Sequence, residues 1–257
     1  VEDYKSDANK LMDGYLQPFL LGTGTALSNG WYNTAKAHKK WGVELMFTAN
    51  ASFVPDTGLF YNVGDMQLDV VELEPSSPDY PNAPTVFGSD QSPTYNFQNS
   101  LLTGQFDGPP GLNMKDEVGS SFAALPTAYL AIGIPSKTDL KFRFVPKVAF
   151  GDGATVSMFG VGVMHDIKQH IPGIKLLPFQ ISALVAYSQL NFDYELDEME
   201  PENIGQFDVN AWTFQALISK KLSVITFYGG VGYSTSSAAL NMKGNYDVDG
   251  DGVVDVS

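Results

Sequence analysis

Apolar and polar residues alternate along several long segments of the chain. In residues 41–53 every second residue from Trp41 to Phe53 is apolar, and polar residues such as Glu44 and Asn50 stand between them. Similar alternation marks residues 140–150, 159–163, 179–188 and 212–219, and a further apolar segment covers residues 222–233. A period of two is typical of a β-strand with two different faces. Strands of about 10–14 residues exceed the usual length in soluble proteins and are long enough to cross a bilayer.

The two faces of these strands differ in chemistry. In residues 140–150 the aromatic Phe142 and Phe144 alternate with the cationic Lys141 and Arg143. A cation on the lipid-facing side of a membrane barrel costs about 2–4 kcal/mol, so we expect the apolar row to face lipid and the polar row to face the lumen. The predicted lipid-facing residues are Phe142, Phe144, Phe159, Trp212 and Phe214. The predicted lumen-facing residues are Glu44, Lys141, Arg143, Lys147 and Gln215. This polar row favours an internal ion-pair network that fills the barrel, and the polar lining of a conduit is the alternative.

The connections between the strands alternate in length. Residues 135–138 and 219–221 are tight turns and residues 165–175 are compact, whereas residues 191–209 and the segment after Tyr233 are long and acidic. Lysines therefore collect on the side of the short turns and carboxylates on the other side. Outer-membrane barrels have this asymmetry, with short periplasmic turns and long external loops. The sequence predicts an all-β fold, a transmembrane antiparallel up-and-down β-barrel.

Two regions do not follow the strand pattern. Apolar residues recur at helical spacing between Ser6 and Leu21, and they predict a helix. This helix is either packed on a core as a surface element or placed in the barrel mouth as a hatch. The candidate hatch residues are Leu11, Met12, Tyr15, Leu16 and Phe19. We expect residues 1–36 to form the hatch and residues 37–257 the barrel, with short strands and a large loop in residues 55–114.

The last residues of the sequence are rich in aspartate and glycine. Their spacing matches a calcium-binding loop, in which hard oxygen ligands converge around a tight turn. The candidate ligands are the carboxylates of Asp247, Asp249, Asp251 and Asp255 and the carbonyl of Val253. A capacity to bind Ca²⁺ is one reading, and a solvated acidic loop tip is the other. Because a barrel closes with a final strand, we expect the later strands to be missing from this sequence.

Composition narrows the functional classes. The formal net charge is -14 and the chain has no cysteine, which argues against nucleic acid as a partner and excludes thiolate chemistry. The apolar runs are too short to predict a transmembrane helix. The five-residue spacing of His165 and His170 favours two interfacial histidines over a metal pair. We find no nucleophile motif and no phosphate-binding loop, and therefore expect no enzymatic activity.

Two stretches resemble known outer-membrane proteins. Residues 30–38 read GWYNTAKAH, and residues 160–179 read GVGVMHDIKQHIPGIKLLPF. Together they are similar to an uncharacterised Bacteroidota outer-membrane family that distantly resembles the FadL long-chain fatty-acid transporters and PorV, a subunit of the type 9 secretion system. The resemblance implies a barrel of about 14 strands with an N-terminal hatch, for which residues 11–20 are the matching segment. It implies no catalytic residues.

The expected protein is therefore an integral β-barrel of the bacterial outer membrane. We expect it to act as a structural or accessory subunit of an envelope or secretion complex, with outer-membrane lipid and other outer-membrane or periplasmic proteins as partners. A FadL-like transporter or channel for hydrophobic small molecules is one alternative. A secreted, soluble, calcium-binding β-sandwich is another.

Overall fold

The chain forms two compact units. The computed structural model describes residues 2–98, 104–150, 154–195 and 204–243. Unit 1 comprises Val1–Thr23 and Ala51–Ala124, and unit 2 comprises Gly24–Asn50 and Leu125–Ser257. This division differs from the predicted boundary at residue 36. The reason is a long-range strand pairing, because a strand before residue 54 pairs with one that begins at residue 122 and the chain between them forms most of unit 1.

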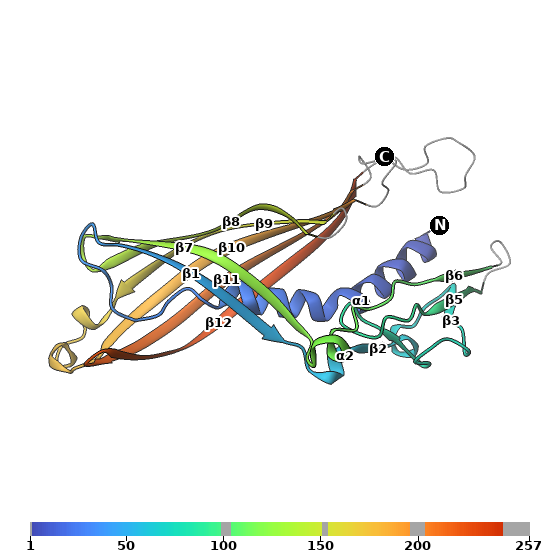
Figure 1. Ribbon diagram of the computed structural model, residues 1–257, viewed down its shortest axis with the longest axis horizontal. Helices are drawn as coiled ribbons and strands as arrows, with labels where there is room; N and C mark the ends of the chain where they lie inside the picture. Colours follow the sequence, from blue (N-terminus) through green and yellow to red (C-terminus); the bar gives the residue numbers. More distant parts are fainter. Residues whose placement is uncertain (1, 99–103, 151–153, 196–203, 244–257) are drawn as a thin grey trace. The chain divides into compact units, whose positions relative to one another are not determined.

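A seven-stranded sheet, most of it in unit 2, dominates the fold. Its spatial order is β1-β7-β8-β9-β10-β11-β12, and it curves into a half-barrel (Figure 1). The strands are β1 (Val43–Phe53), β7 (Phe122–Ile134), β8 (Thr138–Phe150), β9 (Ala154–Asp166), β10 (Gln180–Glu195), β11 (Ile204–Leu222) and β12 (Ile225–Lys243). From β7 to β12, each strand pairs antiparallel with the next one along the chain. The predicted antiparallel, up-and-down order is confirmed for this sheet, and its closure into a full membrane barrel stays a prediction.

Tight connections join these strands at one end of the sheet, where successive strands meet. Ile134 at the end of β7 pairs with Thr138 at the start of β8, across a connection that includes Ser136 and Lys137. Ser136 and Lys137 both have positive φ, the backbone region that lets a short hairpin turn match the twist of its strands. Leu222 and Ile225 pair in the same way between β11 and β12, with Ser223 in the positive-φ region. The turn expected at residues 135–138 is therefore formed, whereas the turn expected at residues 219–221 lies at residues 223–224, because β11 continues to Leu222.

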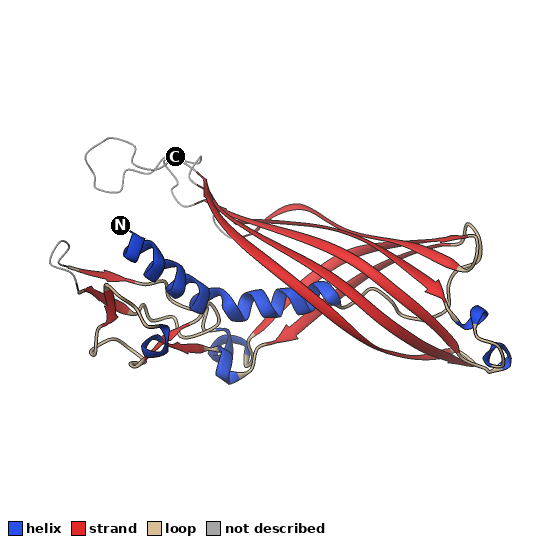
Figure 2. Ribbon diagram, turned by 180° about the vertical axis from the view of Figure 1, so that it is seen from behind, coloured by secondary structure: helices blue, strands red, loops and turns tan. Residues whose placement is uncertain are grey.

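Unit 1 combines a long helix with small sheets. Helix α1 (Glu2–Ser28) is longer than the predicted helix and contains Pro18; its residues up to Thr23 lie in unit 1 (Figure 2). One small sheet pairs β2 (Phe60–Asn62) with β4 (Asn82–Pro84), and the other has the order β3 (Val71–Leu73), β5 (Thr94–Phe97), β6 (Gln105–Asp107). The remaining helices are α2 (Met114–Val118) and the 3₁₀ helices η1 (Asp56–Gly58), η2 (Val63–Met66), η3 (Lys168–His170) and η4 (Ile174–Leu176), the last two in unit 2. Within the described residues, no helix combines the length and the apolar character needed to cross a membrane.

The small sheets of unit 1 are held to α1 by an apolar core. Val63, Val71 and Tyr95 are buried in it, with Tyr4 and Leu11 of the helix packed alongside. Gly14 lets the helix approach this core closely, because a Cβ atom at this position would lie 2.3 Å from the methyl carbon of Met66. The segment that was expected to combine short strands with a large loop therefore packs as a folded module.

A buried carboxylate fixes the same contact. Asp7 of α1 is fully buried, and its oxygens accept hydrogen bonds from the backbone N–H groups of Asp69, Val70 and Val71 at 2.8–3.1 Å. Lys10 lies 3.6 Å from one of these oxygens. Burial alone raises the pKa of Asp7, but the N–H donors and the Lys10 charge outweigh burial and leave its pKa below the ordinary value. The ionised carboxylate thus ties the helix to the strand β3.

We predict that Asp7→Asn loosens unit 1 locally, by about 1.5–3 kcal/mol, because Asn accepts fewer and weaker hydrogen bonds. Since the pKa of Asp7 is lowered on folding, its contribution is present above the unfolded pKa and lost as the pH falls through the folded pKa. Hydrogen exchange of the peptide around Val70 should accelerate in the variant at neutral pH, and the difference from wild type should shrink in acid. Asp3→Asn, at an exposed position of the same helix, is the matched control. Equal exchange in wild type and Asp7→Asn would contradict this role.

Candidate functional site

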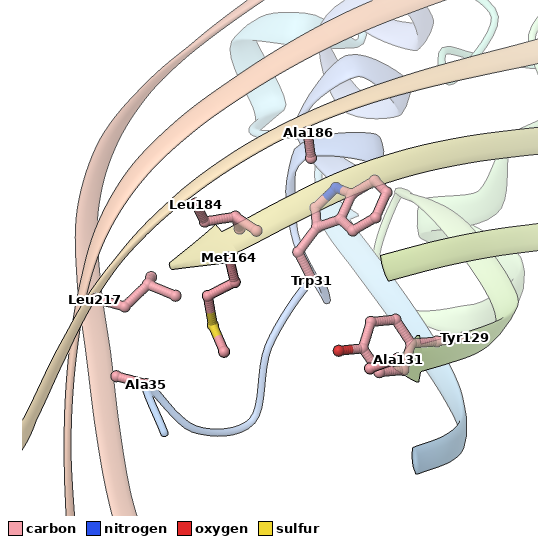
Figure 3. Packing of buried hydrophobic residues seen from close by; sticks show 8 residues of the cluster. All are labelled: Trp31, Ala35, Tyr129, Ala131, Met164, Leu184, Ala186 and Leu217. Carbon is pink, nitrogen blue, oxygen red and sulfur yellow. The ribbon is translucent and has the colours of Figure 1, made fainter. Parts of the chain in front are cut away.

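The inner face of the half-barrel is filled by a segment of the chain itself. Every second residue of these strands, such as Tyr129 and Leu184, is buried, and we call the face that these residues share the inner face. We call residues 24–39 the plug segment. Trp31 of this segment has an exposed fraction of 0%. Figure 3 shows Trp31 and Ala35 among side chains of the sheet, which belong to β7, β9, β10 and β11. The cluster consists of Trp31, Ala35, Tyr129, Ala131, Met164, Leu184, Ala186 and Leu217.

Two glycines of β9 make room for the indole ring. A Cβ atom at Gly160 would lie 3.0 Å from the Trp31 ring, and one at Gly162 would lie 3.2 Å from it. Gly133 of β7 has a similar role at the end of the plug segment, because a Cβ atom there would lie 2.2 Å from the Lys39 carbonyl oxygen. Residues 30–38 and the start of residues 160–179, which carry the resemblance to outer-membrane proteins, are therefore in direct contact.

Arg143 of β8 anchors the plug segment electrostatically. Its side chain is fully buried, and it donates hydrogen bonds to the Leu27 carbonyl at 3.0 Å and to the Thr127 hydroxyl at 3.3 Å. The guanidinium carbon lies 4.8 Å from the centroid of the Trp31 ring. Leu27 belongs to the last turn of α1, where unpaired carbonyls and the helix dipole favour a cation. The helix has no basic residue of its own in that turn, and Arg143 supplies the charge from the sheet.

A second group of polar contacts holds the other end of the plug segment. The fully buried carboxylate of Asp139 accepts a hydrogen bond from the His38 backbone N–H at 2.8 Å and lies 2.9 Å from His38 Nδ1. His38 Nε2 lies 3.8 Å from Glu44, and Glu44 also accepts a hydrogen bond from Asn33 at 2.8 Å. These contacts pair the charges of the inner face with the plug segment.

Two serines fix the middle of the plug segment. Ser182 of β10 donates to the Ala35 carbonyl at 2.6 Å, and the Ala35 N–H donates to the Ser219 hydroxyl of β11 at 2.9 Å. Both serines are buried. The backbone of Ala35 is thus satisfied by two neighbouring strands, and its carbonyl and N–H do not need water. The plug segment is bound at its start, middle and end.

The predicted lumen-facing residues divide into two groups. Glu44, Lys141, Arg143 and Gln215 lie on the inner face; Lys141 is 2% exposed and donates to the Tyr129 hydroxyl. Lys147 departs from the row. The register of β8 and β9 shifts between Val145 and Val148, so one extra residue reverses the alternation and places Lys147 on the opposite face. There it forms an ion pair with Asp193 at 2.9 Å.

The predicted lipid-facing residues lie on the outer face of the sheet. Their exposed fractions are 56% for Phe144, 50% for Phe159, 47% for Trp212 and 44% for Phe214, and Phe142 is half-buried. The row extends over the neighbouring strands, where further large apolar side chains are exposed, among them Leu45, Phe47, Val161, Val163, Val185, Ile218, Phe227 and Tyr233. A continuous exposed apolar surface of this kind marks an interaction surface.

The predicted hatch residues belong to unit 1. Leu11 packs against the core around Val63, Phe19 packs beside Phe87, and the Tyr15 hydroxyl donates to the Pro110 carbonyl at 2.9 Å. Leu16 is half-buried, and Met12 is 38% exposed. In unit 2 the inner face is filled by the plug segment instead. The predicted hatch of residues 1–36 includes most of the plug segment, but the candidate hatch residues were placed on the helix before it, because residues 29–39 have no regular period; GWYN with its glycine and aromatic residues was a visible signal.

Unit 1 contains an apolar pocket. Its volume is about 440 Å³, and aromatic side chains of α1 and the small sheets line it, among them Tyr4, Tyr15, Tyr61, Tyr95, Phe97 and Phe106. The Tyr61 and Tyr95 hydroxyl oxygens lie 3.0 Å apart. Burial, reinforced by the neighbouring Tyr95, raises the pKa of Tyr61, and burial raises the pKa of Tyr95. Both phenols therefore remain neutral, and the pocket offers an uncharged, aromatic environment.

The predicted calcium ligands, Asp247, Asp249, Asp251, Val253 and Asp255, lie outside the described residues. Among the described residues, no cluster of three or more histidines and carboxylates could hold a metal ion. His165 and His170 do come together, with their Nε2 atoms 2.9 Å apart and their rings stacked. His165 Nδ1 also lies 2.7 Å from the Thr138 hydroxyl, so this pair has hydrogen-bond partners of its own.

The fold and this site define a half-barrel protein with a polar, plugged inner face and an apolar outer face. A protein-family model described as "Family of unknown function (DUF6588)" matches residues 1–256, and the chain belongs to this family. Searches of the curated proteins and of the solved structures gave no match.

We predict that Gly162→Val destabilises the protein by about 1–3 kcal/mol, because the added side chain must displace Trp31 from a closely packed position. Gly229→Val is the matched control, since a Cβ atom at Gly229 in β12 meets no atom within 4 Å. Denaturant unfolding followed by tryptophan fluorescence measures both variants. An equal effect of the two substitutions would contradict the packing role of Gly162.

Proposed function

We propose that the chain is an integral outer-membrane β-barrel protein that acts as a structural or accessory subunit of an envelope or secretion complex. The observation that carries this proposal is the division of the sheet into two faces. Phe144, Phe159 and Trp212 are about half exposed on the outer face, whereas Lys141 and Arg143 are buried on the inner face. A soluble sheet would place these two kinds of residue the other way round.

The energetic reason lies in the surrounding solvent. Each Å² of apolar surface transferred from water to an apolar medium lowers the free energy by about 25 cal/mol. The exposed apolar side chains of the outer face are therefore more stable in lipid than in water. Cations on the inner face avoid lipid and find hydrogen-bond partners within the protein, as Arg143 does with Leu27 and Thr127. The long strands β10 to β12 exceed the roughly 9–11 residues that cross a bilayer.

The plug segment favours a structural role over a conduit. Trp31 and Ala35 are fully buried on the inner face; hydrogen bonds donated by Arg143 and Ser182, and one accepted by Ser219, hold the segment in place. Opening a path along this face would break these bonds and unpack Trp31, and each hydrogen bond lost typically costs about 0.5–1.5 kcal/mol. The proposed role is non-catalytic, and labelling by a serine-reactive probe would contradict it.

A transporter or channel for hydrophobic small molecules is the second candidate. The apolar pocket of unit 1 favours it, because Leu11, Met12 and Tyr15 of α1 help to line a cavity of about 440 Å³. Small-molecule sites in proteins are typically concave, apolar and of this size.

We predict for this candidate that an apolar fluorescent probe binds the purified protein and that Phe106→Asp weakens its binding about tenfold, because the substitution places a charge in the apolar lining. Phe53→Asp, in the same unit at an exposed position outside the lining, is the control. Fluorescence titration gives both affinities. Unchanged binding in Phe106→Asp would contradict a ligand in this pocket.

For the membrane proposal, we predict that Phe214→Arg near the middle of β11 costs about 2–4 kcal/mol of folding free energy, since the cation would face lipid. In water the same exposed position would tolerate the change within about 0.5 kcal/mol. Val118→Arg, at a position of unit 1 where Val118 is 61% exposed, should be neutral in either case. Unfolding titrations in detergent or lipid compare the three proteins, and a neutral Phe214→Arg would contradict the proposal.

Membrane fractionation and a heat-modifiability gel test the same proposal at the level of the whole chain. We predict that the protein sediments with the outer membrane and changes its gel mobility on boiling, because a folded barrel resists detergent at room temperature. A protein that stays in solution without detergent, and binds Ca²⁺, would instead support the secreted β-sandwich.

A further inference from the structure

One end of the unit 2 sheet is strongly basic although the chain is strongly acidic. The sequence has 15 Lys and Arg and 29 Asp and Glu residues. Four segments, residues 29–42, 135–137, 167–179 and the strand end and turn at 219–224, contain eight of these cations and none of the carboxylates. The eight are Lys36, Lys39, Lys40, Lys137, Lys168, Lys175, Lys220 and Lys221.

The strand register places these four segments at the same end of the strands. The end of β7 pairs with the start of β8, and the start of β8 pairs with the end of β9. The start of β10 pairs with the ends of β9 and β11, and the end of β11 pairs with the start of β12. Residues 29–42 reach the same end, because the Trp41 N–H donates to the carbonyl of Gly133 near the end of β7 at 2.7 Å. The lysines therefore surround one rim of the half-barrel.

Two of the eight lysines serve the fold. Lys168 is 8% exposed and donates to the carbonyls of Leu177 and Phe179, and Lys137 lies 3.4 Å from the Asp166 carboxylate. The other six are exposed and have no carboxylate partner among the described residues. We call these six the basic rim: Lys36, Lys39, Lys40, Lys175, Lys220 and Lys221.

Exposed apolar side chains stand directly beside these lysines. Trp41 follows Lys40 and is 69% exposed, with the Lys40 ammonium 5.9 Å from its ring centroid. Leu176 follows Lys175 and is 94% exposed, and Val224 is 88% exposed in the turn after Lys221. Turns in water are normally polar, so three connections that each combine lysine with a protruding apolar side chain require a separate explanation.

We propose that the basic rim binds the headgroups of anionic phospholipids while the neighbouring apolar side chains enter the membrane interface. This inference rests on the proposed membrane location. Basic residues next to Trp and Leu are the combination that binds anionic lipid surfaces, where each Lys near the surface contributes about 1 kcal/mol. A hollow of about 630 Å³ lies at this rim, and Lys36, Lys220 and Lys221 line it together with Glu44.

The apolar residues favour lipid over an acidic protein as the occupant. An acidic protein segment would be attracted by the lysines, but it would gain nothing from Leu176 and Val224, which protrude singly. Lipid accommodates both kinds of side chain at once, since headgroups meet the lysines and acyl chains meet the apolar tips. Trp41 also has the amphipathic ring that prefers the level of the headgroups.

The experiment reconstitutes the full chain into vesicles of phosphatidylcholine and of phosphatidylcholine mixed with phosphatidylglycerol. Density-gradient flotation first establishes membrane insertion. Quenching of tryptophan fluorescence by brominated forms of either lipid then gives their relative binding constant, and Trp41→Phe identifies the contribution from the rim. We expect a preference for phosphatidylglycerol of at least about threefold, which falls with added salt because exposed charges are screened.

Two charge-matched double variants complete the test. Lys220→Gln/Lys221→Gln should bring the preference close to one, whereas Lys5→Gln/Lys115→Gln, which removes two exposed lysines of unit 1, should leave it unchanged. Equal binding of both lipids by wild type, as an acidic protein partner would produce, overturns the lipid proposal but leaves the membrane location intact. An equal loss in both double variants overturns it as well. Failure to float with either vesicle contradicts both proposals.

Discussion

The burial of Arg143 is the interaction on which the inner face of the half-barrel depends. A guanidinium stays charged inside a protein, and hydrogen bonds and contacts to its planar face offset the cost of burying it. Leu27 at the end of α1, Thr127 on β7 and the ring of Trp31 supply those contacts. One side chain thus connects a helix end, two strands and the plug segment, and removing one of its contacts leaves the buried cation with less compensation.

The two faces of the sheet separate two physical tasks. The inner face is specific, because Gly160 and Gly162 provide space for Trp31, and Ser182 and Ser219 match the backbone of Ala35. The outer face is non-specific, since a row of Phe, Val and Trp side chains needs only an apolar neighbour. A lipid bilayer is such a neighbour. The basic rim lies at one end of the strands. A membrane interface is the environment in which its charges and the neighbouring apolar side chains are favourable together.

Unit 1 is stabilised by different means. It has short strands of three or four residues, and their pairing alone provides little stability. The compensating contacts are aromatic packing around Tyr95 and the carboxylate of Asp7, which accepts N–H donors from three successive residues. A module built in this way surrounds an aromatic pocket without a large sheet of its own.

The sequence by itself determined the long strands, the antiparallel order with its tight turns and the opposite facing of Phe144 and Arg143, because alternation is a local property of the chain. It misplaced Lys147, since a bulge between Val145 and Val148 depends on pairing with β9 and leaves no periodic signal. It left open whether the helix at residues 11–20 packs on a core or forms a hatch in the barrel mouth; residues 11–19 pack in unit 1, and residues 24–39 fill the inner face. Only the tertiary structure decided this. The fit of Trp31 against Gly160 and Gly162 joins residues more than a hundred positions apart, and no local pattern records such a contact.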